Sequence, residues 1–416
     1  MRVPGTMINE KGDTLMKVMV QKFGGTSVQD ENTRSAACAH VKRAVESGMK
    51  VVVVVSAMGR KGSPYATDTL SDLIRDEKTP APRREQDLLL SCGEVISAVV
   101  FSEQLRASGL ETMAFTGGQA GIRTNNTFGD AGIEEVQTSF LEEAFEHIDA
   151  AVVAGFQGTS GPDITTLGRG GSDTTAAALG AALQAEVVEI FTDVDGVMTA
   201  DPGIVKEASL LTAVTYEEVS NLAVHGARVV HPRAVETARQ GGIPMRIRST
   251  ISDRPGTWIS SRSAASGSGK RQVTGIAHKS GLTRITVRSV EDGSLQQNVF
   301  REMADAGISV DFISIQPSAV LYTVPSERAP EAVRRLEQRG YEPECLEGCT
   351  KISAVGAGMT GIPGVAATMI DALAKYDIEI YQASDSHTTI WVLVSSSNEK
   401  QAVSALHDAF CLNRSS

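Results

Sequence analysis

Apolar runs typical of buried strands recur along the first 255 residues of the chain. Residues 18–23 form one run, and the five consecutive valines at 51–55 have the composition of a central parallel strand covered on both faces. Further strand-like runs cover 112–115, 150–154 and 187–192. They alternate with helix-like segments over 85–105 and 133–146.

This alternation predicts an α/β domain with a mainly parallel central sheet and helices on both faces. The strands in such a sheet place ligands beyond their carboxyl ends. Most of the expected strands end in a glycine-rich or polar loop, so we look for the functional site in those loops.

The last third of the chain repeats its pattern at an offset of 70 residues. The matched pairs are Phe300 with Ile370, Met303 with Leu373, Ile308 with Ile378, Val310 with Ile380 and Ser314 with Ser384. Each copy reads as a strand, an amphipathic helix and two strands. A module of about 60 residues that leaves one face of its sheet exposed is rarely stable by itself, so we expect the two copies to pair.

Composition divides the chain into five segments. Residues 1–16 carry no periodic pattern, and we predict a disordered extension there. The serine-rich and glycine-rich segment 260–271 is typical of a flexible linker. The predicted folded parts are therefore a large α/β domain over 17–259 and two small modules over 272–348 and 349–412.

Charge and composition exclude several partners. The net charge of -11, without any run of five basic residues, argues against nucleic acid and anionic membrane surfaces. No stretch approaches the ~20 apolar residues that span a bilayer, and no secretory signal is evident, so we expect a cytoplasmic protein. The five scattered cysteines are interpreted as reduced thiols, and we expect no metal-binding site built from them.

The first candidate loop follows the first strand and comprises Lys22–Val28. One ammonium, two glycines and two hydroxyls in succession can surround phosphate oxygens. The pattern differs from the GxxxxGK[ST] of P-loop enzymes, and GxGxxG is missing after the first strand, which disfavours a dinucleotide-dependent dehydrogenase. The alternative is a Gly-Gly turn beside an incidental lysine.

The second candidate loop comprises Gly168–Asp173. It combines glycine flexibility with a guanidinium, from Arg169, that suits a bidentate grip on a carboxylate. The carboxylate of an amino acid is the expected ligand. Asp173 could simply cap the following helix, although one carboxylate can both cap a helix and hold Lys22.

Four ordered motifs resemble the aspartate kinase family: KFGGTSV at 22–28, SCGE at 91–94, GRGGSDTTAA at 168–177 and FTDVDGVMTADP at 191–202. The resemblance spans about Lys17 to Phe410, and the small modules resemble ACT domains. Within the family the chain is most similar to monofunctional enzymes of Bacillus-type bacteria. The resemblance implies an amino-acid-kinase fold followed by two ferredoxin-like βαββαβ ACT modules. It also implies that ATP with Mg²⁺ phosphorylates L-aspartate to 4-phospho-L-aspartate, the first step toward lysine, diaminopimelate, threonine and methionine.

The resemblance also assigns roles to individual residues. Lys22 would neutralise the transferring phosphoryl group and Asp173 would orient it. The implied substrate-binding residues are Ser27, Thr67, Glu94, which would contact the ammonium, and Arg169, which would hold a carboxylate. The implied nucleotide-binding residues are Lys22, Gly24, Gly25, Ser56, Thr192, Asp193, Met198, Thr199, Ala200, Asp201, Pro202 and Arg228. Two positions depart from the family pattern, since Arg228 replaces a lysine and Gly203 an arginine.

The implied chemistry is consistent with this set of residues. A carboxylate with a pKa near ~4 is ionised at neutral pH, so its attack on phosphorus needs no general base. Catalysis then depends on positioning and charge neutralisation. His231 is accordingly interpreted as a structural histidine.

Regulation is expected because ACT pairs bind amino acids at their shared interface. The implied effector-binding residues are Asp311, Ser384, Ser386, His387 and Thr388, and exposed turns are the alternative for this hydroxyl-rich segment. The candidate effectors are meso-diaminopimelate, lysine and threonine, and the protein is expected to form a homo-oligomer through its ACT domains. Two other functions stay open at this point: a kinase for glutamate or acetylglutamate, and a catalytically weak amino-acid sensor.

Overall fold

The computed structural model describes residues 16–76, 79–227, 229–261, 272–289, 293–357, 359 and 362–413. These residues form two compact units. The first unit holds the described residues up to Val197, Leu210–Ala223 and 229–261, and the second holds Met198–Ser209, Val224–Ala227 and the described residues from 272 onward. The predicted extension and linker lie outside the described residues, except for residues 16, 260 and 261, and so does Arg228.

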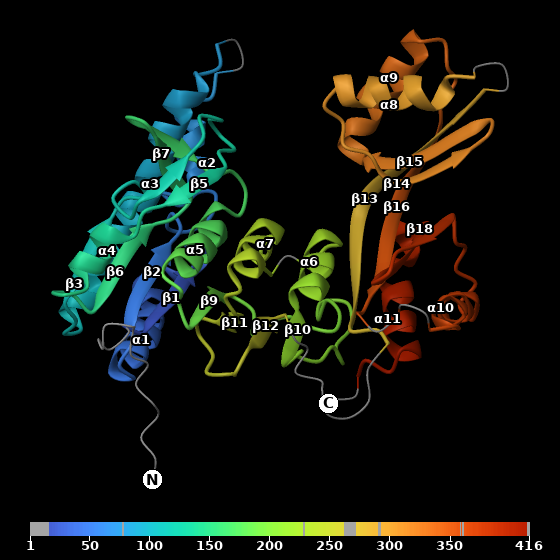
Figure 1. The fold of residues 1–416 in the computed structure, drawn as a ribbon. Coiled ribbons are helices and arrows are strands. Elements are labelled where there is room, and N and C mark those ends of the chain that lie inside the picture. The colour runs from blue at the N-terminus through green and yellow to red at the C-terminus, as the bar shows by residue number, and fades with distance from the viewer. Residues whose placement is uncertain are drawn as a thin grey trace. The chain divides into compact units, whose positions relative to one another are not determined.

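The first unit is built on an eight-stranded sheet with the order β10-β12-β11-β9-β1-β2-β6-β3 (Figure 1). Its strands are β1 (Val18–Phe23), β2 (Lys50–Val55), β3 (Thr112–Phe115), β6 (Ala150–Ala154), β9 (Val187–Thr192), β10 (Ala213–Thr215), β11 (Met245–Ser249) and β12 (Thr257–Ser260). All neighbouring pairs are parallel except β11 with β12. The predicted mainly parallel sheet is confirmed.

Helices cover both faces of this sheet. On one face α1 (Glu31–Glu46) and α3 (Arg83–Ala107) enclose a core that includes Phe23 and Val53. On the other face lie α5 (Gly171–Ala182) and α7 (Pro232–Gly241), where Val20 and Val188 pack beneath α5. Successive strand residues point to opposite faces, so Lys22 shares the face of Val20 and points toward α5.

A second, four-stranded sheet, with the order β5-β4-β7-β8, was not expected. Its strands are β4 (Ile122–Thr124), β5 (Ile133–Val136), β7 (Gln157–Ser160) and β8 (Asp163–Thr166). The predicted helix over 133–146 is therefore wrong in its first part: residues 133–136 pair with β4, and only Ser139–Ala144 forms a helix, α4. Antiparallel pairing with β4 overrides the local helix propensity of these residues.

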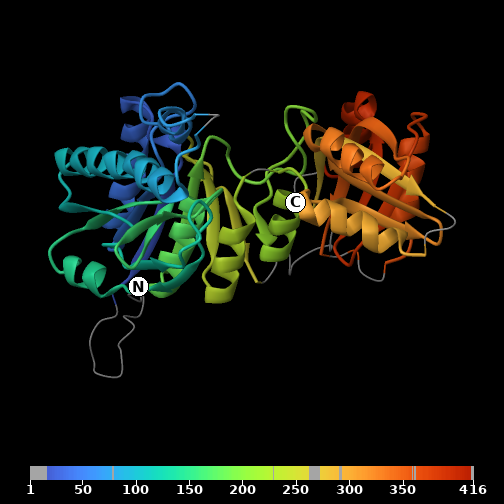
Figure 2. The ribbon, with the colours of Figure 1, turned by 90° about the horizontal axis from the view of Figure 1, so that it is seen from above.

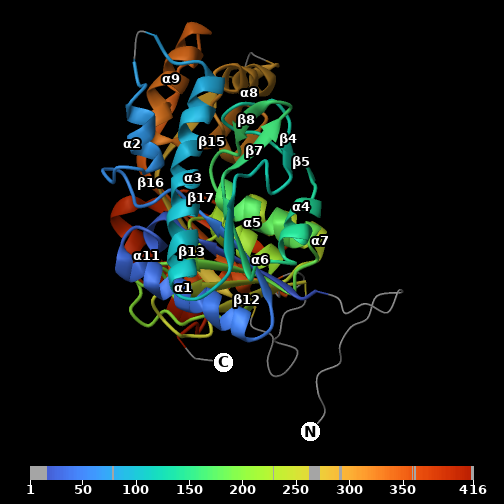
Figure 3. The ribbon, with the colours of Figure 1, turned by 90° about the vertical axis from the view of Figure 1, so that its left-hand side faces the viewer.

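Helix α3 lies lengthwise along the first unit (Figure 3). It is the one helix in the described part of the chain that is long and apolar enough to cross a membrane. However, it carries Asp87, which is 1% exposed and whose carboxylate accepts hydrogen bonds from the backbone N–H groups of Gly129 and Thr166. A buried, hydrogen-bonded acid of this kind belongs to the packed interior of a folded domain.

The second unit contains a six-stranded antiparallel sheet with the order β14-β15-β13-β16-β18-β17. Its elements are β13 (Gly275–Arg288), α8 (Leu295–Asp305), β14 (Asp311–Gln316), β15 (Ala319–Pro325), α9 (Ala329–Gln338), β16 (Glu344–Val355), α10 (Val365–Ala374), β17 (Gln382–Asp385), β18 (Thr389–Ser395) and α11 (Glu399–Ala409). The predicted repeat is confirmed, because α8, β15 and α9 recur 70 residues later as α10, β18 and α11. Figure 2 shows α8 and α9, in orange, against the strands of this unit.

The two modules share their central strands. The end of β13 pairs with β15, whereas its beginning, Gly275–Lys279, pairs with the part of β16 that also pairs with β18. The predicted boundary between the modules, at 348 and 349, falls within β16. The last residues of β13 therefore lie in the sheet of the first module, and its first residues lie in the sheet of the second module.

Candidate active site

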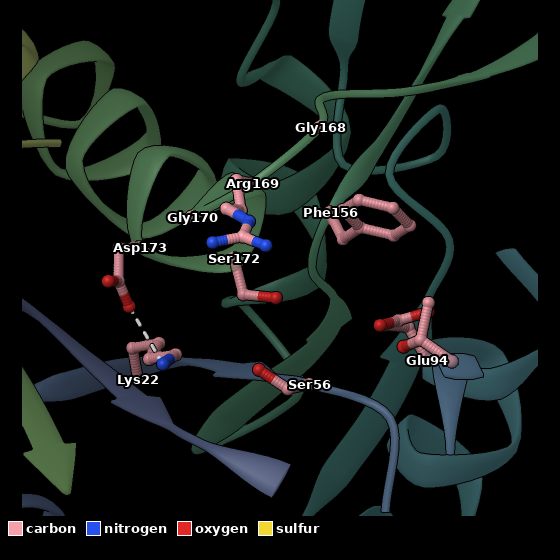
Figure 4. A pocket seen from close by; sticks show the side chains of 11 residues that line it. Lys22, Ser56, Glu94, Phe156, Gly168, Arg169, Gly170, Ser172 and Asp173 are labelled. Carbon is pink, nitrogen blue, oxygen red and sulfur yellow. Dashed lines mark ion pairs between the residues drawn. The ribbon is translucent and has the colours of Figure 1, made fainter. Parts of the chain in front are cut away.

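A pocket of about 390 Å³ lies in the first unit, beside the amino end of α5 (Figure 4). It is lined by Lys22, Ser56, Thr67, Glu94, Phe156, Gly168, Arg169, Gly170, Gly171, Ser172 and Asp173. Six of the residues predicted from the sequence meet there, from five separate segments of the chain. Lys22, near the end of β1, and the Gly168–Asp173 loop line one cavity, whereas Gly24 and Gly25 do not line it.

Lys22 and Asp173 form an ion pair at one side of the pocket. The distance from Lys22 Nζ to Asp173 Oδ1 is 2.7 Å, and each side chain is 13% exposed. The other carboxylate oxygen of Asp173 accepts a hydrogen bond from the backbone N–H of His231 at 3.3 Å. Asp173 also lies in the first turn of α5, where the helix dipole favours an anion. Asp173 therefore fixes the position of the Lys22 ammonium.

The Gly168–Gly171 loop needs glycine for its conformation and for its packing. Gly168 and Gly170 have φ angles of 69° and 71°, in the left-handed region. A side chain at Gly170 would collide with the ring of His231, and one at Gly168 would meet the Asp130 carboxylate. Arg169 is held between these glycines, and its guanidinium projects over the pocket in Figure 4.

Glu94 comes from α3 and lies across the pocket from Lys22 and Asp173 in Figure 4. It is 2% exposed, and its Oε1 accepts a hydrogen bond from the backbone N–H of Ala57 at 3.1 Å. Its Oε2 has no hydrogen-bond partner among the described residues. Burial raises the pKa of Glu94 to about 8. A cationic ligand group would find an acceptor there.

Phe156 and Ser172 line the pocket without having been assigned a role from the sequence. Phe156 has a φ of 69°, which is uncommon for a residue with a bulky side chain, and its N–H donates to Thr175 Oγ1 at 3.1 Å. Phe156 lies two residues beyond β6. Its place just beyond the carboxyl end of a buried strand is the feature of the sequence that could have identified it as a pocket residue.

Several other predicted residues of the first unit do not line this pocket. Ser27 is 3% exposed, and its Oγ lies 2.6 Å from Thr250 Oγ1. Gly24 and Gly25 lie in the turn after β1, where a side chain at Gly25 would collide with two backbone carbonyls. Asp193, next to Thr192 at the end of β9, forms an exposed ion pair of 2.7 Å with Arg60.

The predicted nucleotide-binding residues Met198–Pro202 belong to the second unit. Thr199 is fully buried, and its hydroxyl lies 3.0 Å from Nε2 of His407 in α11. Ala200 packs in the core formed by α10, α11 and their strands. The predicted role of these residues therefore stays a prediction.

A second pocket, of about 980 Å³, lies in the second unit. It is lined by Asp385, the last residue of β17, by Ser386 and His387 in the turn that follows, and by Ile362–Ala366 at the start of α10. This pocket includes two of the five residues predicted to bind an effector. Ser384 lies on β17 and Thr388 is 9% exposed, and neither lines the pocket.

Asp311, the fifth predicted effector residue, takes part in a different contact within the same unit. Its Oδ2 lies 2.9 Å from Nζ of Lys351, whose side chain is 3% exposed. The Lys351 ammonium also lies 5.5 Å from the ring centroid of Phe312 and 4.9 Å from that of Trp391. Asp311 therefore compensates a buried cation.

Comparison with known proteins agrees with this architecture. Residues 17–249 match the Amino acid kinase family, and residues 344–408 match the ACT domain. Aspartokinase 1 of Bacillus subtilis (strain 168) is 51% identical over 404 residues, which is 96% of this chain and 100% of that protein. The aspartokinase of Mycolicibacterium smegmatis is 39% identical over 412 residues, 95% of this chain and 97% of that protein.

The structure of E. coli aspartokinase III in complex with aspartate and ADP has a TM-score of 0.72 and 25% identity, covering 94% of this chain and 99% of that chain. The fold and the pocket thus define an amino acid kinase with ACT domains. More narrowly, the chain belongs to the aspartokinase family, and the protein is an aspartate kinase. The alternatives of a kinase for another acidic amino acid and of a catalytically weak sensor are not favoured.

Proposed function

We propose that the pocket binds L-aspartate beside the γ-phosphate of ATP and produces 4-phospho-L-aspartate, the first intermediate toward lysine, diaminopimelate, threonine and methionine. One observation carries the proposal: an ammonium, a guanidinium and a buried carboxylate, from Lys22, Arg169 and Glu94, line one cavity of about 390 Å³. That cavity suits a small zwitterion with a second carboxylate.

The acceptor is held by charge complementarity. Glu94, with one oxygen lacking a partner among the described residues, receives the ammonium of aspartate. Arg169 grips a carboxylate in bidentate fashion, and the hydroxyl of Thr67 adds a polar contact. These groups leave the other carboxylate of aspartate as the nucleophile, directed toward Lys22.

Phosphoryl transfer requires positioning and charge neutralisation. The ionised carboxylate oxygen of aspartate attacks the γ-phosphorus, and the bond from phosphorus to the leaving ADP oxygen breaks. Lys22 stabilises the charge on the transferring group, and Asp173 holds Lys22 in place at 2.7 Å. Because the nucleophile is already ionised, the mechanism needs no general base.

Mg²⁺ accompanies ATP in this proposal and supplies neutralisation of the phosphate charge when bound. Within the described residues no group of three His, Cys, Asp or Glu side chains could hold a metal ion. Asp173, which lines the pocket beside Lys22, would hold the ion through a carboxylate oxygen, the kind of ligand that Mg²⁺ prefers. The remaining nucleotide contacts are those implied by the sequence at Gly24, Gly25, Ser56, Thr192, Asp193 and Arg228.

Regulation occurs through the second unit. An amino-acid effector, namely lysine, threonine or meso-diaminopimelate, binds near Ser386 and His387 and favours an inactive state by about 1–3 kcal/mol of coupling. In support, the structure of E. coli aspartokinase III in complex with lysine and aspartate has a TM-score of 0.74 and 25% identity to this chain. A homo-oligomer formed through the ACT domains and a cytoplasmic location complete the proposal.

Substitution of Lys22 tests the catalytic assignment. Lys22→Ala removes the charge that stabilises the transferring phosphoryl group, so kcat should fall at least ~100-fold. The measurement is trapping of the acyl phosphate with hydroxylamine, with aspartate, glutamate and acetylglutamate as acceptors. Lys42→Ala, at an exposed lysine of α1, is the matched control and should keep the wild-type rate. A Lys22→Ala enzyme with the wild-type rate, or trapping of another acceptor alone, would refute the proposal.

A further inference from the structure

A buried hydrogen-bonded group connects two loops that the sequence assigned to ATP. It centres on Thr250, the residue directly after β11, which is 4% exposed. Its Oγ1 lies 2.6 Å from Ser27 Oγ, in the turn after β1, and 3.3 Å from the carbonyl oxygen of Thr192, at the end of β9. The backbone N–H of Thr250 also donates to this carbonyl at 3.0 Å.

The directions of these hydrogen bonds follow from the chemistry of the groups. A carbonyl oxygen only accepts, so the Thr250 hydroxyl donates its single proton to Thr192. Ser27 must then donate to Thr250. The proton of the Ser27 hydroxyl is therefore used inside the protein, where it holds the turn after β1 to Thr250.

His40 of α1 also holds Thr250 in place, through a hydrogen bond to its backbone. Its Nε2 lies 3.0 Å from the carbonyl oxygen of Thr250, so Nε2 carries the proton. Its Nδ1 lies 2.8 Å from a guanidinium nitrogen of Arg43 and accepts from it. Burial lowers the pKa of His40, which agrees with this neutral form.

The group lies where the backbone ladder of the sheet ends. The last register pair between β1 and β9 is Phe23 with Phe191, and the last pair between β9 and β11 is Thr192 with Ser249. Beyond these pairs the strands continue into loops. Thr250 then holds the turn after β1 and the end of β9 together, because it accepts from Ser27 and donates to the Thr192 carbonyl.

We propose that Thr250 is a positioning residue that fixes the Gly24–Ser27 turn against the Thr192–Asp193 turn and so sets the ATP-binding geometry next to Lys22. The inference rests on the proposed function, in which both turns contact ATP. The active-site pocket does not include Thr250, so its effect must reach ATP through these loops. Aspartate, held by Glu94 and Arg169, should be affected little.

Two substitutions at Thr250 separate the hydroxyl from the volume of the side chain. Thr250→Val removes the hydroxyl at nearly constant shape, and the KM for ATP should rise about tenfold, as expected for the loss of two buried hydrogen bonds. The KM for aspartate should stay within about twofold. Thr250→Ser keeps the hydroxyl and should restore the KM for ATP. Equal rises in both KM values, or no rescue by serine, would contradict a positioning role.

A double-mutant cycle with Ser27→Ala gives a second readout. If Ser27 acts through Thr250, the double variant Ser27→Ala/Thr250→Val should raise the KM for ATP no more than Thr250→Val alone. Additive effects would overturn the inference. If Thr250→Val does not fold, Ser27→Ala alone should still raise the KM for ATP, and an unchanged value there would also overturn it.

ATP binding measured by calorimetry separates this inference from the proposed function. If the wild-type enzyme does not phosphorylate aspartate, the proposed function fails. The weaker ATP binding of Thr250→Val, with recovery in Thr250→Ser, would still support the positioning role. Unchanged ATP affinity in Thr250→Val would refute that role whatever the acceptor is.

Discussion

At the scale of single residues, the environment of a side chain decides its chemistry more than its type does. Glu94 is one of 50 acidic residues in the chain, yet its burial in the pocket sets it apart. Burial disfavours the ionised form, and the hydrogen bonds from the backbone of Ala57 and of Glu94 itself only partly offset this cost. Strongly shifted acids in a cavity are typical of functional sites.

This shift predicts how aspartate binding depends on pH. Below the Glu94 pKa of about 8 the carboxyl group of the free enzyme is protonated, and it must lose its proton to receive an ammonium. The kcat/KM for aspartate should therefore rise from about pH 6 to about pH 8 and then level off. Calorimetry at neutral pH in buffers of different ionisation enthalpy should show release of nearly one proton per aspartate bound.

Glu94→Gln is the control for this prediction. Its pH profile should be flat over the same range, and its KM for aspartate should rise about 10–100-fold, as for the loss of a hydrogen bond to a charged group. A wild-type profile without pH dependence would contradict the assignment.

The raised pKa of Glu94 also implies that the free enzyme loses stability as the pH increases from 4.5, the ordinary pKa of a glutamate, toward 8. Over that range the folded state holds a proton that the unfolded state has lost.

At the scale of elements, the loop that precedes α5 is the most constrained segment near the pocket. Its glycines adopt left-handed conformations, and one of them contacts α7 through His231, the N-cap residue of that helix. His231 therefore has the structural role that the sequence predicted, since its backbone also donates to Asp173. The loop, α5 and α7 form one connected support for Arg169.

Gly170→Ala should disrupt this support. The left-handed φ alone costs about 1–2 kcal/mol for a residue with a Cβ, and the new methyl group would also collide with the ring of His231. We expect a clearly lower Tm and loss of most activity. Gly161→Ala is the matched control: Gly161 has a φ of 57°, but no neighbouring atom lies within 4 Å of the place that its Cβ would occupy, so only the conformational cost should appear, with activity retained. Equal behaviour of the two variants would show that the contact with His231 is unimportant.

At the scale of the whole molecule, the compact units do not coincide with continuous stretches of sequence. Met198–Ser209 and Val224–Ala227 precede the predicted linker, yet they pack with the C-terminal modules. Ala200 and Val205 join the hydrophobic core that includes Leu406 of α11. The predicted division into 17–259 and 272–412 describes the order of the modules along the chain, but it does not describe the packing of these two segments.

The pocket beside α10 predicts the outcome of effector titrations. When lysine, threonine and meso-diaminopimelate are titrated separately, one of them should inhibit the wild-type enzyme. His387→Ala should raise the concentration of this effector that is needed for inhibition about tenfold, within the usual range of coupling energies, and leave kcat unchanged. His147→Ala, at an exposed histidine of the first unit, is the control. Inhibition of His387→Ala at the wild-type concentration would remove His387 from the effector site.

Features that are written in the order of residue types could be predicted without coordinates. Strand and helix alternation indicated the mainly parallel sheet, the 70-residue repeat indicated the paired modules, and the polar ends of strands marked Lys22 and the loop around Arg169. These signals are local because periodicity, turn chemistry and strand ends are properties of short segments.

Contacts between groups that lie far apart in the chain became known from the folded structure alone. It placed the Ser27 hydroxyl against Thr250, brought Phe156 into the pocket and buried Thr199 beside His407. Hydrogen bonding and desolvation depend on partners that lie far apart in the chain, so the pKa of Glu94 and the hydrogen-bond partner of Ser27 are set only after folding.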